Sequence, residues 1–407
     1  MYVDLADFLA NTDDGARAKE ILGKCVHCGF CTATCPTYQI LGDELDGPRG
    51  RIYQIKELVE GAAATRNTQK HLDRCLTCLN CETTCPSGVR YGQLVHIGKK
   101  IVDQQVERSL RERLSRALLM RILPYRKRIG LLVRLGQWFR FALPSTLRAK
   151  VYPRRDPGPI PSTQHDRFMI SLDGCVQPSM APAINASTAR VFDKLGIRLV
   201  DAAQSGCCGA ASLHTGAEDQ GLQFIRRNID AWWPLVEQGA EAVVVNASGC
   251  GAIVKEYGDI MRNDPDYAVR AAKIASLCVD PVEILRNEDL SELNLIPPNR
   301  PIAFHPPCTL QHAQKLGGSV ESLLSNLGFQ LSPVRDSHLC CGSAGTYSLF
   351  QPELSKQLRD NKTRALEQGA PEKIATANIG CLYHLQGGTQ TPVVHWIELL
   401  DASADKL

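Results

Sequence analysis

The sequence predicts a multidomain α+β protein with a small helical domain at its N-terminus, followed by two copies of an α/β module. Three observations predict it. Eight of the seventeen cysteines fall in two short runs before residue 90. Apolar runs that end at cysteines recur 133 residues further along the chain, at Cys175 and Cys308. A chain of 407 residues is also long for one compact core.

The bulk composition is that of a soluble globular protein. Hydrophobic residues make up 44%, charged residues 22%, and the net charge is +3, so bulk charge points to no partner. The first twenty residues lack a basic and apolar signal segment, and no apolar window is long enough to span a membrane. An odd number of cysteines excludes a fully paired disulfide framework and favours metal ligation in a reducing cytoplasm.

The first domain, residues 1–105, is predicted from two runs with one spacing. Residues 25–36 and 75–86 both read C-x2-C-x2-C-x3-C-P. In bacterial ferredoxins three cysteines of such a run bind one [4Fe–4S] cluster and the fourth binds the other, while zinc ribbons leave this spacing unexplained. The predicted ligands are Cys25, Cys28, Cys31 and Cys85 for the first cluster, and Cys75, Cys78, Cys81 and Cys35 for the second.

A helix is predicted between the two runs. The stretch from Gly47 begins with a turn and continues with apolar residues at helical spacing, such as Ile52 and Ile55. The 50 residues between Cys25 and Cys75 favour a helical ferredoxin-like domain. Nearby arginines either offset the negative charge of the clusters or lie solvated at the surface; they are Arg49, Arg51 and Arg74.

Residues 106–166 are predicted to form a basic, amphipathic connector. From 108 to 155 there are fourteen Lys or Arg residues and one acid, Glu112, and apolar residues recur at helical spacing from Leu110. Such a helix either lies on an anionic membrane surface or packs on protein with its arginines solvated. We expect no nucleic acid partner, because no base-reading motif accompanies the charge. The proline-rich stretch 151–166 marks a domain boundary.

Residues 167–290 and 300–407 are predicted to be two copies of one α/β module. In each copy a strand-like run ends at a cysteine, a Cys-Cys-Gly triplet follows 32 residues later, and a further apolar run ends in Gly-Cys. Parallel strands with intervening helices place these cysteines at one edge of a sheet. The candidate metal or cluster ligands are Cys175, Cys207, Cys208 and Cys250, and then Cys308, Cys340, Cys341 and Cys381.

Other roles for these cysteines stay open. They could serve thiol redox chemistry, or could be structural, and Cys278 outside the repeat is expected in the core. His305, His338 and His384 lie near module cysteines and are candidates to replace a missing thiol, whereas His27 is expected to tune hydrogen bonding around the first cluster.

Two ferredoxin runs followed by two CCG modules resemble a known family. The stretches CVHCGFCTATCPTY, LDGPRGRIYQIK and RCLTCLNCETTCPSGVRYG are similar to the iron–sulfur subunits of bacterial glycolate oxidases, also called glycolate dehydrogenases. The resemblance implies glycolate oxidation to glyoxylate at FAD on partner flavoprotein subunits. It also implies electron transfer toward the respiratory quinone pool at the cytoplasmic face of the inner membrane. The family's final C-x2-C is absent here after Cys250 and Cys381, so the resemblance does not extend to a noncubane cluster.

Three other functions remain open from the sequence. The chain could be the iron–sulfur subunit of a glycerol-3-phosphate or lactate dehydrogenase, a thiol redox enzyme like heterodisulfide reductase, or a membrane-docking scaffold. No G-x-G-x-x-G follows a predicted strand, so flavin or nicotinamide chemistry is expected on a partner. The cofactors expected in this chain are two [4Fe–4S] clusters, with a further cluster or zinc in the modules.

Overall fold

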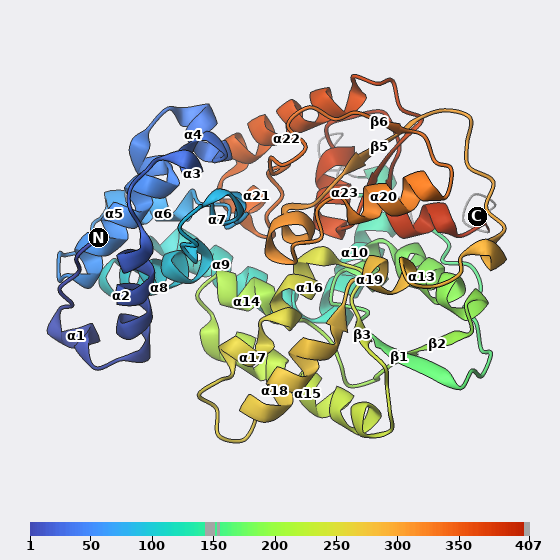
Figure 1. The fold of residues 1–407 in the computed structure, drawn as a ribbon, viewed down its shortest axis with the longest axis horizontal. Helices are drawn as coiled ribbons and strands as arrows, with labels where there is room; N and C mark the ends of the chain where they lie inside the picture. Colours follow the sequence, from blue (N-terminus) through green and yellow to red (C-terminus); the bar gives the residue numbers. More distant parts are fainter. Residues whose placement is uncertain (143–150, 153–154, 403–407) are drawn as a thin grey trace.

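The computed structural model describes residues 1–142, 151–152 and 155–402. A helical domain at the N-terminus, blue in Figure 1, lies against two α/β modules that are stacked on one another, the first in green and yellow and the second in orange and red. The fold class predicted from the sequence, with duplicated modules and parallel sheets, is confirmed.

The N-terminal domain is built from helices that pack through one buried face each. Ile55, Leu94 and Ile101 are buried in its core. Gly98 allows close contact between α5 and α8, since a Cβ there would lie 2.6 Å from a side-chain carbon of Ile55. The elements are α1 (Asp7–Ala10), α2 (Asp13–Lys24), α3 (Phe30–Ala33), α4 (Pro36–Leu41), η1 (Glu44–Asp46), α5 (Pro48–Val59), α6 (Arg66–Asp73), α7 (Asn80–Thr84) and α8 (Tyr91–Gln105).

Two four-stranded parallel sheets form the centres of the modules. Their strand orders are β2-β1-β3-β4 and β6-β5-β7-β8, which are the same order in two successive copies. The repeat read from the cysteine spacing is therefore a repeat of topology. The strands are β1 (Arg167–Ser171), β2 (Ile197–Asp201), β3 (Val243–Val244), β4 (Cys278–Val279), β5 (Ile302–His305), β6 (Leu331–Ser332), β7 (Lys373–Thr376) and β8 (Val393–His395).

Helices cover the sheets and join the two modules into one packed unit. A single hydrophobic core contains Phe192 of the first module and Ile302 and Trp396 of the second. The helices are α12 (Gln177–Met180), α13 (Pro182–Lys194), α14 (Ala210–His214), α15 (Glu218–Glu237), α16 (Ser248–Lys255), α17 (Tyr257–Ile260), α18 (Ala268–Leu277), α19 (Pro281–Leu285), η3 (Ser291–Leu293), η4 (Thr309–Ala313), α20 (Ser319–Asn326), α21 (Tyr347–Phe350), α22 (Pro352–Glu367), α23 (Ile379–Gln386) and η5 (Trp396–Leu400).

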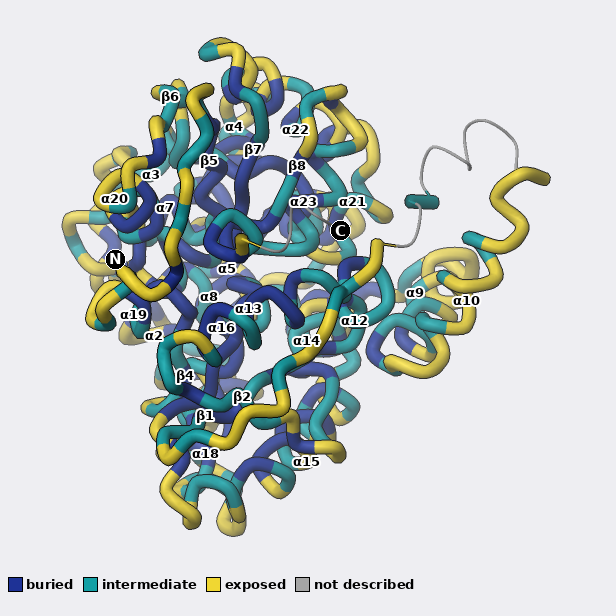
Figure 2. The backbone as a smooth tube through the Cα atoms, turned by 90° about the vertical axis from the view of Figure 1, so that its right-hand side faces the viewer, coloured by how far each residue is buried: buried dark blue, intermediate teal, exposed yellow. Residues whose placement is uncertain are grey.

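The connector forms α9 (Leu110–Ile122), α10 (Arg126–Trp138) and the short turn η2 (Arg140–Ala142). Ser109 and Glu112 form a capping box that starts α9. Figure 2 shows α9 and α10 at one edge of the molecule, with long exposed stretches. The predicted connector residues 143–150 and 153–154 lie outside the described residues.

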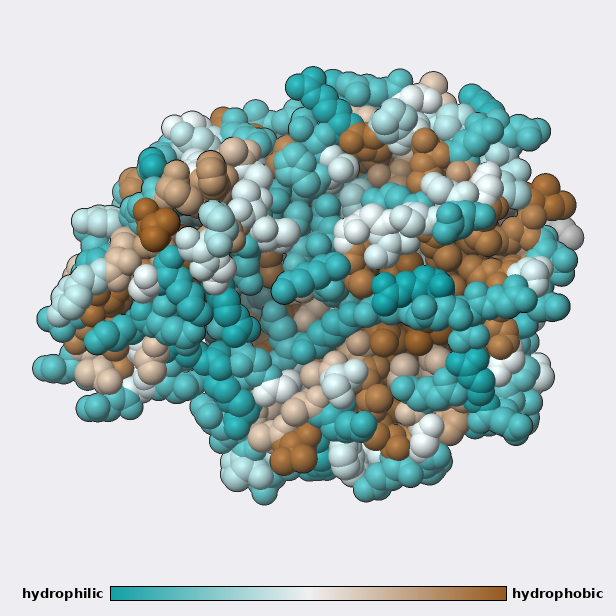
Figure 3. All heavy atoms as spheres, in the orientation of Figure 1, coloured by the Kyte–Doolittle hydropathy of each residue, from teal (hydrophilic) through white to brown (hydrophobic). Residues whose placement is uncertain are grey.

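The surface differs between the two ends of the molecule. On the face drawn in Figure 3, polar side chains dominate, and apolar side chains gather toward the right, over the modules. Among the described residues, none of the helices has both the length and the apolar character that crossing a membrane requires.

Candidate metal centres

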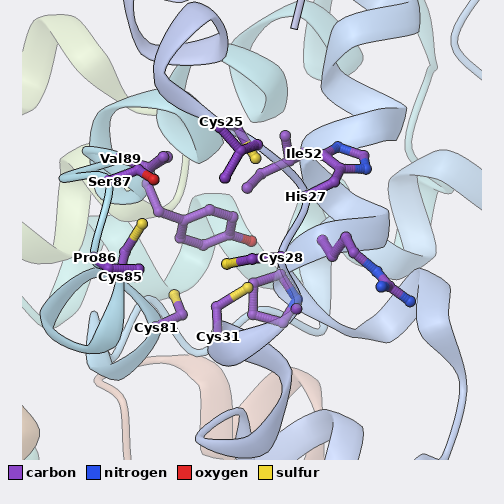
Figure 4. A pocket seen from close by; sticks show the side chains of 15 residues that line it. Cys25, His27, Cys28, Cys31, Ile52, Cys81, Cys85, Pro86, Ser87 and Val89 are labelled. Carbon is purple, nitrogen blue, oxygen red and sulfur yellow. The ribbon is translucent and has the colours of Figure 1, made fainter.

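The two cysteine runs fold into two thiol sets that exchange their last members. Cys25, Cys28, Cys31 and Cys85 line one pocket, together with Cys81 (Figure 4). Cys35, Cys75, Cys78 and Cys81 line the neighbouring pocket. Thus Cys85 of the second run joins the first set and Cys35 of the first run joins the second, while Cys81 lies between the pockets.

The two runs adopt the same turns, and these turns point backbone N–H groups at sulfur. His27 and Thr77, each two residues after the first cysteine, have positive φ values of 55° and 53°. The N–H of Thr77 donates to Cys75 Sγ at 3.4 Å. Gly29 and Leu79, each one residue after the second cysteine, also have positive φ, at 88° and 61°. A left-handed leucine is rare, and such strained turns are typical of functional loops.

The two sets differ in exposure. Cys28 is exposed in the first set, whereas Cys35, Cys75 and Cys81 of the second set are buried. Burial raises the pKa of the Cys31 thiol to about 11. At Cys75 burial also acts to raise the pKa, but Arg51 and Lys99 lower it, and the pKa lies below its ordinary value. The second set therefore has a buried cationic environment of its own.

Arg51 supplies most of that environment. Its side chain is 1% exposed, so the interpretation of the sequence that places this arginine in solvent is wrong. Its Nη1 donates to Thr37 Oγ1 at 3.2 Å, and Thr37 Oγ1 lies 3.2 Å from Cys35 Sγ. Asp46, fully buried, accepts from Arg51 at 3.4 Å and from Arg74 at 2.8 Å. Arg49 is partly exposed and pairs with Glu44.

Each module brings its four predicted cysteines to the carboxyl ends of its parallel strands. In the first module Cys175 and Cys208 lower the pKa of the Cys207 thiol, and Cys207 and Cys250 raise the pKa of the Cys208 thiol. In the second, the sulfurs of Cys308 and Cys340 lie 3.9 Å apart. The sulfurs of Cys341 and Cys381 lie within 4.8 Å of each other. Cys278 is buried in the core of the first module, as expected.

The backbone conformation of each Cys-Cys-Gly triplet favours glycine at its third position. Gly209 and Gly342 have φ values of 92° and 90°, and the N–H of each donates to the sulfur two residues before it at 3.4 Å. A Cβ on Gly342 would lie 2.6 Å from the carbonyl oxygen of Ser355. Each triplet is thus a tight turn that holds its first thiol against a backbone donor.

The second thiol set lies against the second module. Cys78 and Cys308 belong to one small hydrophobic cluster with Leu76, Cys340 and Tyr347. Asn80 of α7 donates to the backbone of Thr34 and of His338 at 3.0 and 3.1 Å. The second set therefore lies between the first set and the cysteines of the second module.

The histidines near the cysteines have different surroundings. His305 lies with Cys341 and Cys381, all three buried, with ligand atoms within 4.8 Å of one another. His384 instead contacts the hydroxyl of Ser355 at 3.2 Å. His27 acts on the first set through its backbone, whose N–H bonds to Cys25 and lowers the pKa of that thiol against the larger effect of burial.

The donor groups fit iron–sulfur clusters. Four thiols converge on each N-terminal pocket, and thiolates are the ligands that iron–sulfur clusters use. Burial raises the pKa values of the Cys78 and Cys81 thiols, and metal binding to a thiol displaces its proton. The buried guanidinium of Arg51 offsets negative charge at the second set.

Comparison with known proteins assigns both parts of the chain. Residues 21–89 match a 4Fe-4S dicluster domain, and residues 170–255 and 302–386 match a cysteine-rich domain, CCG. The glycolate oxidase iron-sulfur subunit of Escherichia coli (strain K12) is 53% identical over 407 residues, 100% of both chains. The probable glycolate oxidase iron-sulfur subunit of Bacillus subtilis (strain 168) is 30% identical, covering 94% of this chain and 91% of that protein.

A more distant relative covers part of the chain. Lactate utilization protein A of Shouchella clausii is 23% identical over 56% of this chain and 96% of that protein. The full-length identity, the dicluster domain and the two CCG domains agree with the resemblance seen in the sequence. The chain belongs to the family of glycolate oxidase iron-sulfur subunits.

Proposed function

We propose that this chain is the electron-transfer subunit of a flavin-dependent complex that oxidises glycolate to glyoxylate. It holds two [4Fe–4S] clusters, the first through Cys25, Cys28, Cys31 and Cys85 and the second through Cys75, Cys78, Cys81 and Cys35. When bound, the clusters supply one-electron redox chemistry. The chain itself binds them, excludes water from the second and adjusts its charge through Arg51.

One observation carries this proposal: the two runs adopt the same pair of left-handed turns, at His27 and Gly29 and at Thr77 and Leu79. Three of these four positions are not glycine, and such backbone strain persists only where the surroundings require it. Two matching strained turns, each bordered by four thiols, support a matching cofactor at each.

The substrate and the partner follow from the relatives. A protein with 53% identity over the full chain is named as the iron-sulfur subunit of glycolate oxidase. A subunit implies further subunits, and we place FAD and the glycolate site on a partner flavoprotein. A direct test is dye reduction by the co-expressed complex with glycolate, lactate or glycerol-3-phosphate as donor. A complex that reduces dye with lactate and not with glycolate would contradict the assignment.

The modules also bind metal in this proposal. The thiols of Cys175, Cys207, Cys208 and Cys250, and those of Cys308, Cys340, Cys341 and Cys381, form the third and fourth sites. Each site takes an iron–sulfur cluster or zinc. The thiols of each module are close enough to shift one another's pKa values, and this supports the proposal, because close sulfurs are suited to chelation.

The connector provides peripheral contact with an anionic membrane in this proposal, so the chain works at the cytoplasmic face of the inner membrane and delivers electrons toward quinone. Trp138 and Phe139 are 75% and 54% exposed, and exposed basic residues occur along the same segment. Apolar and basic side chains together suit a surface of anionic lipid. The exposed basic residues of α9, α10 and η2 are Arg111, Arg113, Arg121, Arg126, Lys127, Arg128, Arg134 and Arg140.

Liposome co-sedimentation tests the membrane contact. The variant with Trp138→Ser and Phe139→Ser should lose binding to vesicles that contain phosphatidylglycerol. The control Ile296→Ser, at a side chain 94% exposed in a different region, should bind like the wild type. Equal binding by all three proteins would exclude the connector as the contact.

Iron and acid-labile sulfide per chain, with EPR of the reduced protein, test the cluster assignment. We expect about eight irons in the N-terminal domain. Cys78→Ala should lose one cluster signal, whereas Cys278→Ala, a matched change at a buried cysteine outside the sites, should keep both. Loss of both signals, or of neither, in Cys78→Ala with an intact fold would contradict the ligand assignment.

A further inference from the structure

His305 is a buried histidine whose ring lacks a hydrogen-bond partner among the described residues. It ends β5, its side chain is 1% exposed, and neither Nδ1 nor Nε2 has a protein partner. Buried polar atoms without partners are rare, and each requires an explanation.

The groups around His305 are metal ligands. One ligand atom each from His305, Cys341 and Cys381 lies within 4.8 Å of the other two. Asn378 Nδ2 lies 3.6 Å from Cys381 Sγ and donates to it. Cys340, the residue before Cys341, has its sulfur 3.9 Å from that of Cys308. One ring nitrogen and two thiols thus lie around one small space.

The fold does not require a histidine here. The interval of 133 residues that relates Cys175 to Cys308 also relates Leu172 to His305. Leu172 is 2% exposed and packs in the core of the first module beside Cys208. An apolar side chain therefore fills this position in the same topology. The second module has a histidine at this position, and its two ring nitrogens have no hydrogen-bond partner among the residues that the structure describes.

We infer that the second module binds a single tetrahedral divalent ion of the zinc type through His305, Cys341 and Cys381, with one position of the tetrahedron left for a further ligand. The first module offers thiols alone. This inference rests on the proposed role of the modules as metal sites and names the ligand chemistry of one of them.

The compact arrangement favours one ion over a cluster. Zinc bonds of about 2.0–2.3 Å at tetrahedral angles place ligand atoms about 3.5–3.8 Å apart, and the three ligand atoms here all lie within 4.8 Å of one another. A cluster spreads its thiolates over several irons. Mixed imidazole and thiolate ligation is also typical of zinc. Binding would satisfy one ring nitrogen of His305 and displace one proton from each ligating thiol.

The test uses the full chain, co-expressed with its flavoprotein partner and purified anaerobically. Zinc and iron per chain are measured, and zinc K-edge absorption reports the ligands of zinc alone. We expect zinc with both nitrogen and sulfur ligands. His305→Leu, which copies the first module, should remove the nitrogen component and release zinc to a chelator at least tenfold more readily.

Two further variants separate ligation from packing. His305→Cys should retain zinc with sulfur ligands only, because a thiolate replaces the imidazole. His312→Gln changes a neighbouring histidine whose ring contacts Thr83 and the backbone of His338, and it should leave the zinc spectrum unchanged. If His305→Leu does not fold, His305→Cys still decides the outcome.

Either of two results would overturn the inference. One is wild-type protein that contains no zinc, and the other is a zinc spectrum without nitrogen that His305→Leu does not alter. The iron count reports the proposed function separately. About eight irons with no zinc would refute the ion at His305 but would agree with two clusters in the N-terminal domain.

Discussion

Arg51 is predicted to set the reduction potential of the second cluster. It is buried, stays charged because its pKa is raised against the effect of burial by Cys75, Tyr91 and other acidic groups, and reaches Cys35 through Thr37 by two contacts of 3.2 Å each. At about 6 Å and an effective dielectric constant of about 20, one charge contributes ~3 kcal/mol. For a one-electron couple this is ~120 mV.

The change to make is Arg51→Gln, and the assay is an EPR-monitored redox titration of the anaerobic protein. The potential of the second cluster should fall by about 100 mV, because the neutral side chain no longer stabilises the extra electron. Arg51→Lys keeps the charge and should shift it by less than about 30 mV. Asp46→Asn removes a buried negative charge and should shift the potential upward.

Arg49→Gln is the matched control, since Arg49 is partly exposed and its field is screened by solvent. Arg51→Gln also leaves Asp46 with less compensation, and breaking a buried pair costs about 3–5 kcal/mol of stability. Iron content and the midpoint of thermal unfolding therefore accompany each titration. A fully loaded Arg51→Gln protein with both potentials unchanged, or with both shifted equally, would refute the reasoning.

Three further predictions concern stability. Burial raises the pKa of Asp280 to about 7, from about 3.9 when unfolded, so the stability of the wild type falls as the pH rises between these values. The melting temperature of Asp280→Asn should therefore rise relative to that of the wild type from pH 5 to pH 8. A difference in melting temperature that is constant with pH would contradict this. Gly342→Ala should lower the unfolding free energy by ~1–3 kcal/mol in urea titrations, because of its positive φ and the oxygen of Ser355, whereas the exposed Gly239→Ala should cost less. Removing iron with a chelator under oxidising conditions should lower the melting temperature of the N-terminal domain, followed by circular dichroism, and an unchanged melting curve would argue against clusters as part of its folding.

The cysteine spacing predicted most of the fold and of the thiol sets, because ligand loops and duplicated modules leave regular intervals in sequence. The left-handed turns at Thr77 and Leu79 could not be predicted, since neither residue prefers positive φ. The burial of Arg51 could not be predicted from the sequence either. It depends on Asp46 and His71, which come to it from other helices and turns. His305 could be predicted as a candidate ligand from its position near Cys308, and the leucine at the matching position of the first module is a second signal in the sequence.

The two modules have diverged in the way they meet the N-terminal domain. The first meets it through ion pairs, such as Arg17 with Asp259 at 2.6 Å and Lys100 with Glu218 at 3.6 Å. The second meets it through its cysteine edge, where Cys308 shares an apolar cluster with Cys78. Ion pairs at a solvated boundary contribute little to stability and fix orientation, whereas an apolar boundary excludes water from the thiols on both sides. We therefore expect changes at the metal site of the second module to alter the spectrum of the second N-terminal cluster, and equivalent changes in the first module to leave it unaltered.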